Sequence, residues 1–140
     1  MEVGIDLVEI DRIRQVQKKY PQFVDKVLGD QERLVYDPLK GQRQTEFLAG
    51  RFAAKEAYAK ALGCGIGRLT LAEIQVLPGP TGKPYLASGP IIQEVSLSIS
   101  HADHYATAVV YLDLDQKEIE ERLTLYWQMK ETKLSRLVTI

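Results

Sequence analysis

The sequence predicts an α+β domain in which a largely antiparallel sheet packs against one long helix. Alternation of apolar and polar residues, as in Val95–Ile99, indicates half-buried strands. An alanine-rich stretch from Glu46 to Leu62 has the composition of a long helix. The order along the chain is one strand, several helices, several strands and a final helix, which favours an α+β fold over an alternating α/β fold.

Length and composition exclude several classes of protein. The 140 residues are 45% apolar and 26% charged, which is typical of one globular domain and excludes a disordered chain, a collagen-like repeat and a coiled-coil rod. No apolar run reaches the roughly 18 residues of a membrane helix, and we recognise no signal peptide. The single cysteine, Cys64, excludes an internal disulfide, so we expect a cytoplasmic protein without membrane association. A net charge of −1 argues against a nucleic-acid partner.

The first half of the chain is predicted to hold one strand followed by helices. Residues 3–7 alternate, and Asp6 lies on the opposite face from the apolar side chains. Apolar residues at helical spacing predict helices over 10–20 and 21–28, with Gly29 as the C-terminal cap of the second. The long helix over 46–62 has Thr45 as its N-cap and Gly63 after its last residue. Turns are predicted at 37–41, 63–67, 78–84 and 101–104.

The second half is predicted to add strands and a C-terminal amphipathic helix. The strands are expected at 74–76, 85–87, 95–99 and 105–112. Asp115–Glu118 has the spacing of a capping box, so a helix should run from Gln116 to about Lys133. We expect its apolar stripe to pack on the body or on a neighbouring subunit: Ile119, Leu123, Tyr126 and Trp127. The opposite side should face water: Lys117, Glu118, Glu121 and Lys130.

Charged residues on the long helix allow two interpretations. By periodicity alone, Glu56 and Lys60 form an ordinary i,i+4 surface pair, which is the more common situation. Alternatively, Glu56 is a carboxylate for a hard cation, and the neighbouring ammonium groups of Lys55 and Lys60 meet phosphate. Asp6, on the minor face of the first strand, would then be the second carboxylate of a magnesium site.

Other polar features are individually weak. The glycine-rich turn at 63–67 lacks the ending of a P-loop and follows a helix, so it is interpreted as a helix end and a turn. A lone histidine at a turn, such as His101, is more often an exposed polar residue than a functional one. The basic residues between 12 and 26 form either a solvated face or a docking site for an acidic partner.

Three longer motifs carry a resemblance to a known family. Gly4–Ile13 (GIDLVEIDRI) resembles the opening motif of the holo-acyl-carrier-protein synthases, the small trimeric type of 4′-phosphopantetheinyl transferase. Phe47–Gly63 (FLAGRFAAKEAYAKALG) is similar to the second motif, and Ser98–His101 followed by Tyr105-Ala106 to the third. The three stand in the family's order and spacing across about residues 3 to 112.

The resemblance implies an activity and a set of site residues. The enzyme would transfer 4′-phosphopantetheine from coenzyme A to a serine of apo-acyl carrier protein, release adenosine 3′,5′-bisphosphate and support fatty acid biosynthesis. Asp6 and Glu56 would bind Mg²⁺, with Glu56 or a metal-bound water as the base. Lys60 would meet the pyrophosphate. The other coenzyme-binding residues would be Arg51, Ser100 and His101. The site would lie between subunits of a homotrimer.

The resemblance also suggests a docking surface and a domain boundary. The acidic carrier protein would bind the helix that follows the first motif, through Arg12, Arg14, Lys18, Lys19 and Phe23. Residues 1–114 would be the transferase domain, and 115–140 a helical extension outside the compact form of the family. A non-enzymatic domain that binds a CoA-like nucleotide is the alternative, but the presence of both Asp6 and Glu56 favours the enzyme.

Overall fold

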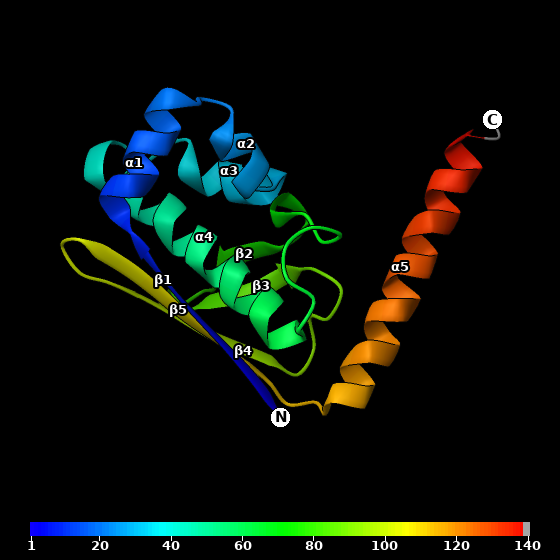
Figure 1. Cartoon of the computed structure of the whole chain (residues 1–140). Helices are drawn as coiled ribbons and strands as arrows, with labels where there is room; N and C mark the ends of the chain where they lie inside the picture. The colour runs from blue at the N-terminus through cyan, green and yellow to red at the C-terminus, as the bar shows by residue number, and fades with distance from the viewer. Residues whose placement is uncertain (139–140) are drawn as a thin grey trace.

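One long helix, α4 (Gly41–Leu62), lies across a three-stranded antiparallel sheet in the structure, a computed structural model that describes residues 1–138 (Figure 1). The strand order is β1 (Glu2–Glu9), β5 (Tyr105–Leu112) and β4 (Val95–His101). A separate two-stranded sheet joins β2 (Gln75–Pro78) to β3 (Pro84–Ser88). The predicted α+β class is confirmed. The remaining helices are α1 (Ile10–Lys19), α2 (Phe23–Val27), α3 (Asp30–Tyr36), the short 3₁₀ turn η1 (Leu71–Glu73) and α5 (Gln116–Val138).

Small residues bring α4 into close contact with β1. A Cβ atom at Gly4 would lie 1.9 Å from the carbonyl oxygen of Ala57, so only glycine fits there. Ala53, Ala57 and Ala61 recur every fourth residue along the same side of α4, and all three are buried. These alanines therefore do more than favour helix formation, because their small volume places the backbone of α4 directly over the first strand.

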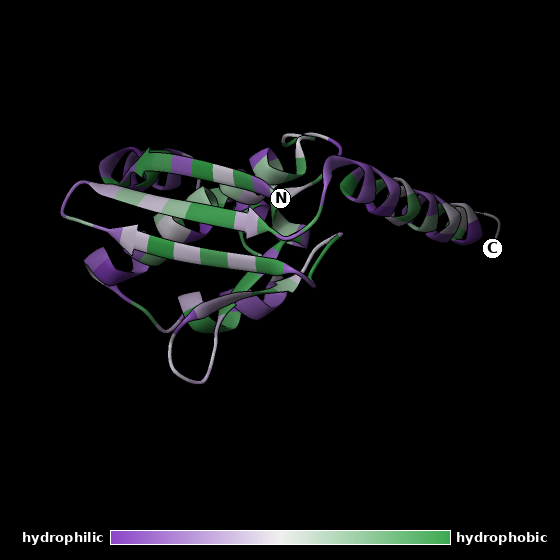
Figure 2. Cartoon of the chain, turned by 90° about the horizontal axis from the view of Figure 1, so that it is seen from below, coloured by the Kyte–Doolittle hydropathy of each residue, from purple (hydrophilic) through white to green (hydrophobic). Residues whose placement is uncertain are grey.

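The other face of this sheet is open and partly apolar. Val3, Ile5 and Leu7 of β1 are each 64% exposed, because they point away from α4. Figure 2 shows the sheet from this uncovered side, with apolar bands along its strands. Val109 of the central strand lies beside Ile5 and is also exposed. Asp6 lies on the opposite, helix-covered side, as the alternation in residues 3–7 predicts.

Helix boundaries in the first half differ from the prediction at two places. Helix α4 begins at Gly41, so Thr45 lies inside it and donates its hydroxyl to the Gly41 carbonyl at 3.4 Å. Helix α3 occupies a stretch in which no helix was predicted, and Gly29 precedes it instead of ending α2. The Gly29 N–H donates to the Glu32 carboxylate at 2.9 Å. This buried carboxylate, which no local pattern reveals, starts the extra helix.

The C-terminal helix α5 is longer than predicted and packs on the body along its first turns. It reaches Val138 instead of about Lys133. The capping box is confirmed, because the Glu118 N–H donates to Asp115 Oδ1 at 2.8 Å and the Asp115 N–H donates to Glu118 Oε1 at 3.4 Å. Ile119 and Leu123 are buried in the main core. No helix within residues 1–138 is long and apolar enough to cross a membrane.

A polar cluster around Glu73 secures the middle of α5. The Tyr126 hydroxyl donates to Glu73 Oε2 at 2.5 Å, and Lys130 Nζ donates to the same oxygen at 2.8 Å. Arg68 lies 4.4 Å from the ring centroid of Trp127. The expectation that Lys130 faces water is therefore wrong, because its long side chain reaches back to the carboxylate beside η1.

Candidate active site

Asp6 and Glu56 line the same cleft, which has a volume of about 300 Å³. Asp6 projects from β1 and Glu56 from α4, so the close packing at Gly4 brings the two carboxylates to one place. Arg12 stands at the same cleft and adds a cation. The other walls come from β1, α1, α2 and α4 and are apolar: Leu7, Val8, Ile13, Val16, Phe23 and Phe52.

Lys60 links the last turn of α4 to the first strand. Its Nζ donates to Asp6 Oδ1 and to the Ile5 carbonyl oxygen, both at 3.0 Å. The simple interpretation, a surface pair between Glu56 and Lys60, is therefore not what the structure contains. Lys60 instead supplies the counter-charge of Asp6, whose side chain is only 16% exposed.

The environment of Glu56 favours its protonated form. Partial burial raises the pKa of Glu56, the negative charge of Asp6 raises it further, and Lys60 opposes both effects. Glu56 is thus a stronger base than an ordinary glutamate.

Two carboxylates in one cleft fit the needs of one magnesium ion. Mg²⁺ commonly takes one or two protein carboxylates and completes its shell with water and substrate phosphates. Within residues 1–138 no three acidic, histidine or cysteine side chains gather closely enough to form an all-protein metal site. Asp6 and Glu56 are therefore suited to an ion that phosphate ligands complete.

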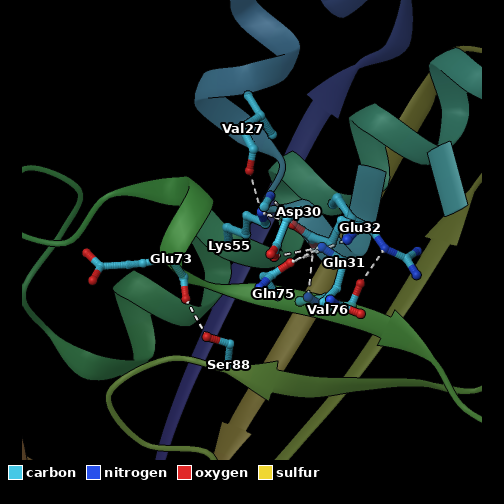
Figure 3. Close-up of polar contacts among 11 residues, drawn as sticks. Val27, Asp30, Gln31, Glu32, Lys55, Glu73, Gln75, Val76 and Ser88 are labelled. Carbon is cyan, nitrogen blue, oxygen red and sulfur yellow. Dashed lines mark hydrogen bonds and ion pairs between the residues drawn. The ribbon is translucent and has the colours of Figure 1, made fainter. Parts of the chain in front are cut away.

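Lys55 does not face a ligand, although it precedes Glu56. Its ammonium is completely buried, bonds Glu32 Oε1 at 2.5 Å and also donates to the Val27 carbonyl (Figure 3). Burial lowers the pKa of Lys55 to about 8, against the opposing effect of Glu32. Glu32 also accepts the Val76 N–H at 2.9 Å. The expectation that Lys55 meets phosphate is wrong, because this ion pair joins α3, α4 and β2 inside the protein.

Arg51 lies on a different side of α4 from Glu56. Five residues along a helix correspond to a rotation of about 140°. The Arg51 guanidinium lies 4.1 Å from the ring centroid of Phe47, and its Nε donates to the Val76 carbonyl at 3.0 Å. Burial lowers the pKa of Arg51 to about 10, so the group stays cationic at neutral pH.

Ser100 and His101 lie apart from the Asp6 cleft and point to opposite faces of the sheet. His101 is on the α4 side, where its Nδ1 lies 3.6 Å from Glu46 Oε2. Ser100 is exposed on the open face and pairs with Thr107 of β5. Neither residue lines the cleft that holds Asp6 and Glu56. One chain alone therefore does not bring all the predicted coenzyme residues together.

The predicted docking residues are grouped on α1 and the start of α2. Lys18 is exposed, and Lys19 Nζ lies 5.4 Å from the ring centroid of Tyr20. Arg14 bonds Asp11 at 2.8 Å and also donates to Gln42. A second hollow of about 260 Å³ adjoins the Asp6 cleft and shares two of its lining residues: Val16 and Phe23.

The apolar lining of the cleft was not predicted as part of a site, and Val16 and Phe52 are two examples of it. The Phe52 ring centroid lies 6.0 Å from that of Phe23, so the pair forms an apolar wall beside Glu56. Val16 was assigned only to the apolar side of a helix, and Phe52 only to a motif. The available signal was their helical spacing from charged residues, Arg12 and Glu56.

Comparison with known proteins gives a consistent result. The chain matches the family model described as the 4′-phosphopantetheinyl transferase superfamily over residues 2–110. It is 44% identical over 112 residues to the holo-[acyl-carrier-protein] synthase of Anoxybacillus flavithermus, covering 79% of this chain and 93% of that relative. It is also 44% identical over 111 residues to the synthase of Enterococcus faecalis, covering 79% of this chain and 95% of that protein.

Solved structures agree with this match. The crystal structure of a holo-(acyl-carrier-protein) synthase from Bacillus anthracis in complex with CoA (3′,5′-ADP) is 46% identical, with a TM-score of 0.70 and coverage of 78% of this chain and 92% of that one. The Helicobacter pylori synthase in complex with coenzyme A is 32% identical, with a TM-score of 0.70 and coverage of 79% and 99%. The family match ends at residue 110, before α5 begins at Gln116.

Proposed function

Because this chain belongs to the 4′-phosphopantetheinyl transferase superfamily, we propose that it is a holo-acyl-carrier-protein synthase. It transfers the 4′-phosphopantetheine group of coenzyme A to a serine of apo-acyl carrier protein, releases adenosine 3′,5′-bisphosphate and thereby supports fatty acid biosynthesis. The observation that carries this assignment is the single cleft in which Asp6 and Glu56 meet, with Lys60 bonded to Asp6.

The two carboxylates and Lys60 have different roles in the proposed reaction. Asp6 and Glu56 would hold Mg²⁺, which when bound stabilises negative charge on the pyrophosphate of the coenzyme. Lys60, which is bonded to Asp6, would place a positive charge beside the cleft, where the leaving bisphosphate gains charge. The serine oxygen forms a bond to phosphorus as the bond to the bisphosphate breaks. Glu56, or a water beside it, accepts the serine proton, and the raised pKa of Glu56 suits it to this role.

The remaining coenzyme residues would come from a neighbouring subunit of a homotrimer. Arg51, Ser100 and His101 do not share the Asp6 cleft within one chain, so a complete site calls for a second chain. The open face of the three-stranded sheet supports this proposal, since three neighbouring side chains of β1 are largely exposed. Apolar patches of this kind on small proteins commonly mark interfaces between subunits.

Carrier docking is proposed on α1 and the start of α2. Arg12, Arg14, Lys18 and Lys19 would attract the acidic carrier, and Phe23 would make an apolar contact beside the cleft. Arg12 and Phe23 line the cleft itself, so a carrier bound there would present its serine close to Glu56.

We further propose that residues 1–114 form the transferase domain and 115–140 a helical addition to it, of which 139–140 lie outside the described residues. The exposed free thiol of Cys64 is compatible with a reducing compartment, so the cytoplasm is the proposed location.

A mass measurement on the carrier tests the proposed function. The protein is incubated with apo-acyl carrier protein, coenzyme A and Mg²⁺, and intact carrier mass is followed with time. We expect the mass to increase by one phosphopantetheine group. A carrier whose acceptor serine is replaced by alanine serves as the control and should not change. Binding of coenzyme A without any mass increase would favour the non-enzymatic alternative.

A further inference from the structure

The outward side of α5 has charged and apolar residues in a symmetrical order. At 100° per residue, six side chains fall within about 120° of one another around the helix. We call this set the outer ridge: Glu118, Glu121, Leu125, Met129, Lys133 and Arg136. The acidic residues are at its N-terminal end, the two apolar residues at its centre and the basic residues at its C-terminal end.

The outer ridge points away from the side of α5 that packs on the body. Its centre lies about 120° around the helix from Ile119 and Leu123, which are buried. At the centre of the ridge, Leu125 is 58% exposed and Met129 is 64% exposed. In Figure 2 the helix extends well beyond the two sheets.

The surface of α5 beside the outer ridge has two hollows that could receive side chains of another helix. Two shallow hollows, of about 580 and 560 Å³, are lined entirely by α5 residues, and Leu125 borders both. Glu121 borders the first hollow, where Glu120 and Lys117 also lie, and Lys133 borders the second, whose other charged residues are all basic. A helical side chain inserted beside Leu125 would bury the apolar part and meet the charge.

The order of the ridge is complementary to itself when the helix is reversed. Three pairs of positions are each centred on position 127: 118 with 136, 121 with 133, and 125 with 129. Two copies laid antiparallel place Glu121 opposite Lys133 and Glu118 opposite Arg136. A parallel arrangement would instead place like charges opposite each other, which is unfavourable.

We propose that the outer ridge of α5 binds the same ridge of a second copy of this chain, antiparallel and across a two-fold axis near position 127. Leu125 of each chain packs against the partner's Met129, and Glu121 of each chain pairs with the partner's Lys133. The contact is isologous, so each interaction occurs twice. It uses a helix outside the family match and none of the residues assigned to transfer, so it goes beyond the proposed function.

A contact between single helices of this length is small, so it should depend on concentration. A stable interface between two free proteins generally buries well over about 1,000 Å² of accessible surface in total. This area is on the order of ten times that of one side chain. If the body is a trimer, three ridges on one assembly can engage at once and raise the apparent affinity. Self-association should also weaken as salt increases, because its exposed charge pairs are screened.

Charge reversal tests both the contact and its direction. Sedimentation velocity at low salt gives the self-association of the full chain against concentration. We expect Glu121→Lys alone and Lys133→Glu alone each to weaken self-association about tenfold, since two attractive pairs become repulsive. A mixture of the two variants should associate again, because the lysine introduced in one chain would meet the glutamate introduced in the other. The matched control is Lys83→Glu in the exposed turn between β2 and β3, which changes the charge by the same amount as Lys133→Glu away from both hollows and should have no such effect.

Other outcomes would overturn the proposal. If both single reversals leave the concentration dependence unchanged, or if no association beyond the body's own state is found at any concentration, α5 does not pair. If an equimolar mixture of Glu121→Lys and the original protein associates more strongly than either protein alone, the helices meet in parallel, because only a parallel pair would place the introduced lysine opposite the Glu121 of the other chain. Far-UV circular dichroism verifies that each variant stays helical. Transfer activity per chain should stay the same in every variant, so failure of this contact is distinguishable from failure of the proposed function.

Discussion

Lys60 Nζ lies 3.0 Å from Asp6 Oδ1, joining two residues that are 54 positions apart in the chain. The contact places an ammonium on one carboxylate of the cleft, while the second carboxylate, Glu56, lies one helical turn before Lys60 on α4. Opposite charges are thus already arranged around the position where a substrate pyrophosphate and its metal ion would bind.

Removing either carboxylate should abolish most of the transfer activity. We expect Asp6→Asn and Glu56→Gln each to lower turnover by at least ~10²-fold, because metal stabilisation of this reaction is worth several kcal/mol. Carrier modification measured across a range of Mg²⁺ concentrations tests the expectation. Near-normal turnover in either variant, with magnesium still required, would remove that residue from the proposed metal site.

The raised pKa of Glu56 predicts an unusual effect on stability. Its pKa in the folded state lies above the unfolded-state value of about 4.3, so folding favours the protonated form of Glu56. The resulting contribution of Glu56 to the free energy of unfolding is fully present below about pH 4.3. It is lost as the pH rises through the folded-state pKa. Without metal, Glu56→Gln should therefore raise the melting temperature at pH 7, and the difference should shrink toward pH 4. Millimolar Mg²⁺ should stabilise the original protein more than the variant. A lower melting temperature for the variant at pH 7 without metal would contradict the proposed effect of burial and of Asp6 on Glu56.

Shared sites predict that two inactive variants can complement each other. If His101 acts on a coenzyme whose metal is held by the neighbouring subunit, mixed assemblies of His101→Ala and Glu56→Gln contain some intact sites. Subunits exchanged under mild conditions should therefore recover part of the activity that each variant lacks. No recovery, despite exchange verified by mass spectrometry, would place both residues in the site of one subunit.

Reversing charge on α1 should impair carrier binding selectively. Lys18→Glu with Lys19→Glu should weaken carrier binding, mainly through a slower association rate, and reduce its dependence on salt. Coenzyme A affinity should stay nearly the same. Stopped-flow association at several salt concentrations measures the effect, with Lys117→Glu on α5 as a distant control. Unaltered carrier affinity at low salt would move the docking surface elsewhere.

The buried pair Lys55–Glu32 should matter to stability through its charge balance. Lys55→Met leaves the Glu32 carboxylate buried without a cation, which typically costs about 3–5 kcal/mol of unfolding free energy. Adding Glu32→Gln should recover most of that loss, because the amide oxygen can still accept a backbone N–H such as that of Val76. Urea denaturation of the single and double variants gives the comparison. A double variant no more stable than Lys55→Met would argue against an electrostatic origin.

Most of the helices and strands could be predicted from local patterns in the amino-acid sequence. Alternation in residues 3–7 placed Asp6 opposite the apolar side chains, and the capping box at Asp115 located the start of α5. Motifs that are continuous along the chain were sufficient to predict the family, and they also singled out Asp6 and Glu56, which line one cleft. Such patterns can be recognised because the residues that define them are neighbours on one helix or strand.

Which charged residues stay exposed and which become buried depends on packing between distant segments, and the sequence did not reveal it. Lys55 and Lys60 are both lysines on the same helix, yet Lys55 is buried against Glu32 while Lys60 bonds Asp6 at the surface. The unpredicted helix α3 likewise depends on the Glu32 carboxylate and its distant partners. These outcomes depend on residues far apart in sequence, since burial and charge pairing are properties of the packed chain. No local pattern contains that information.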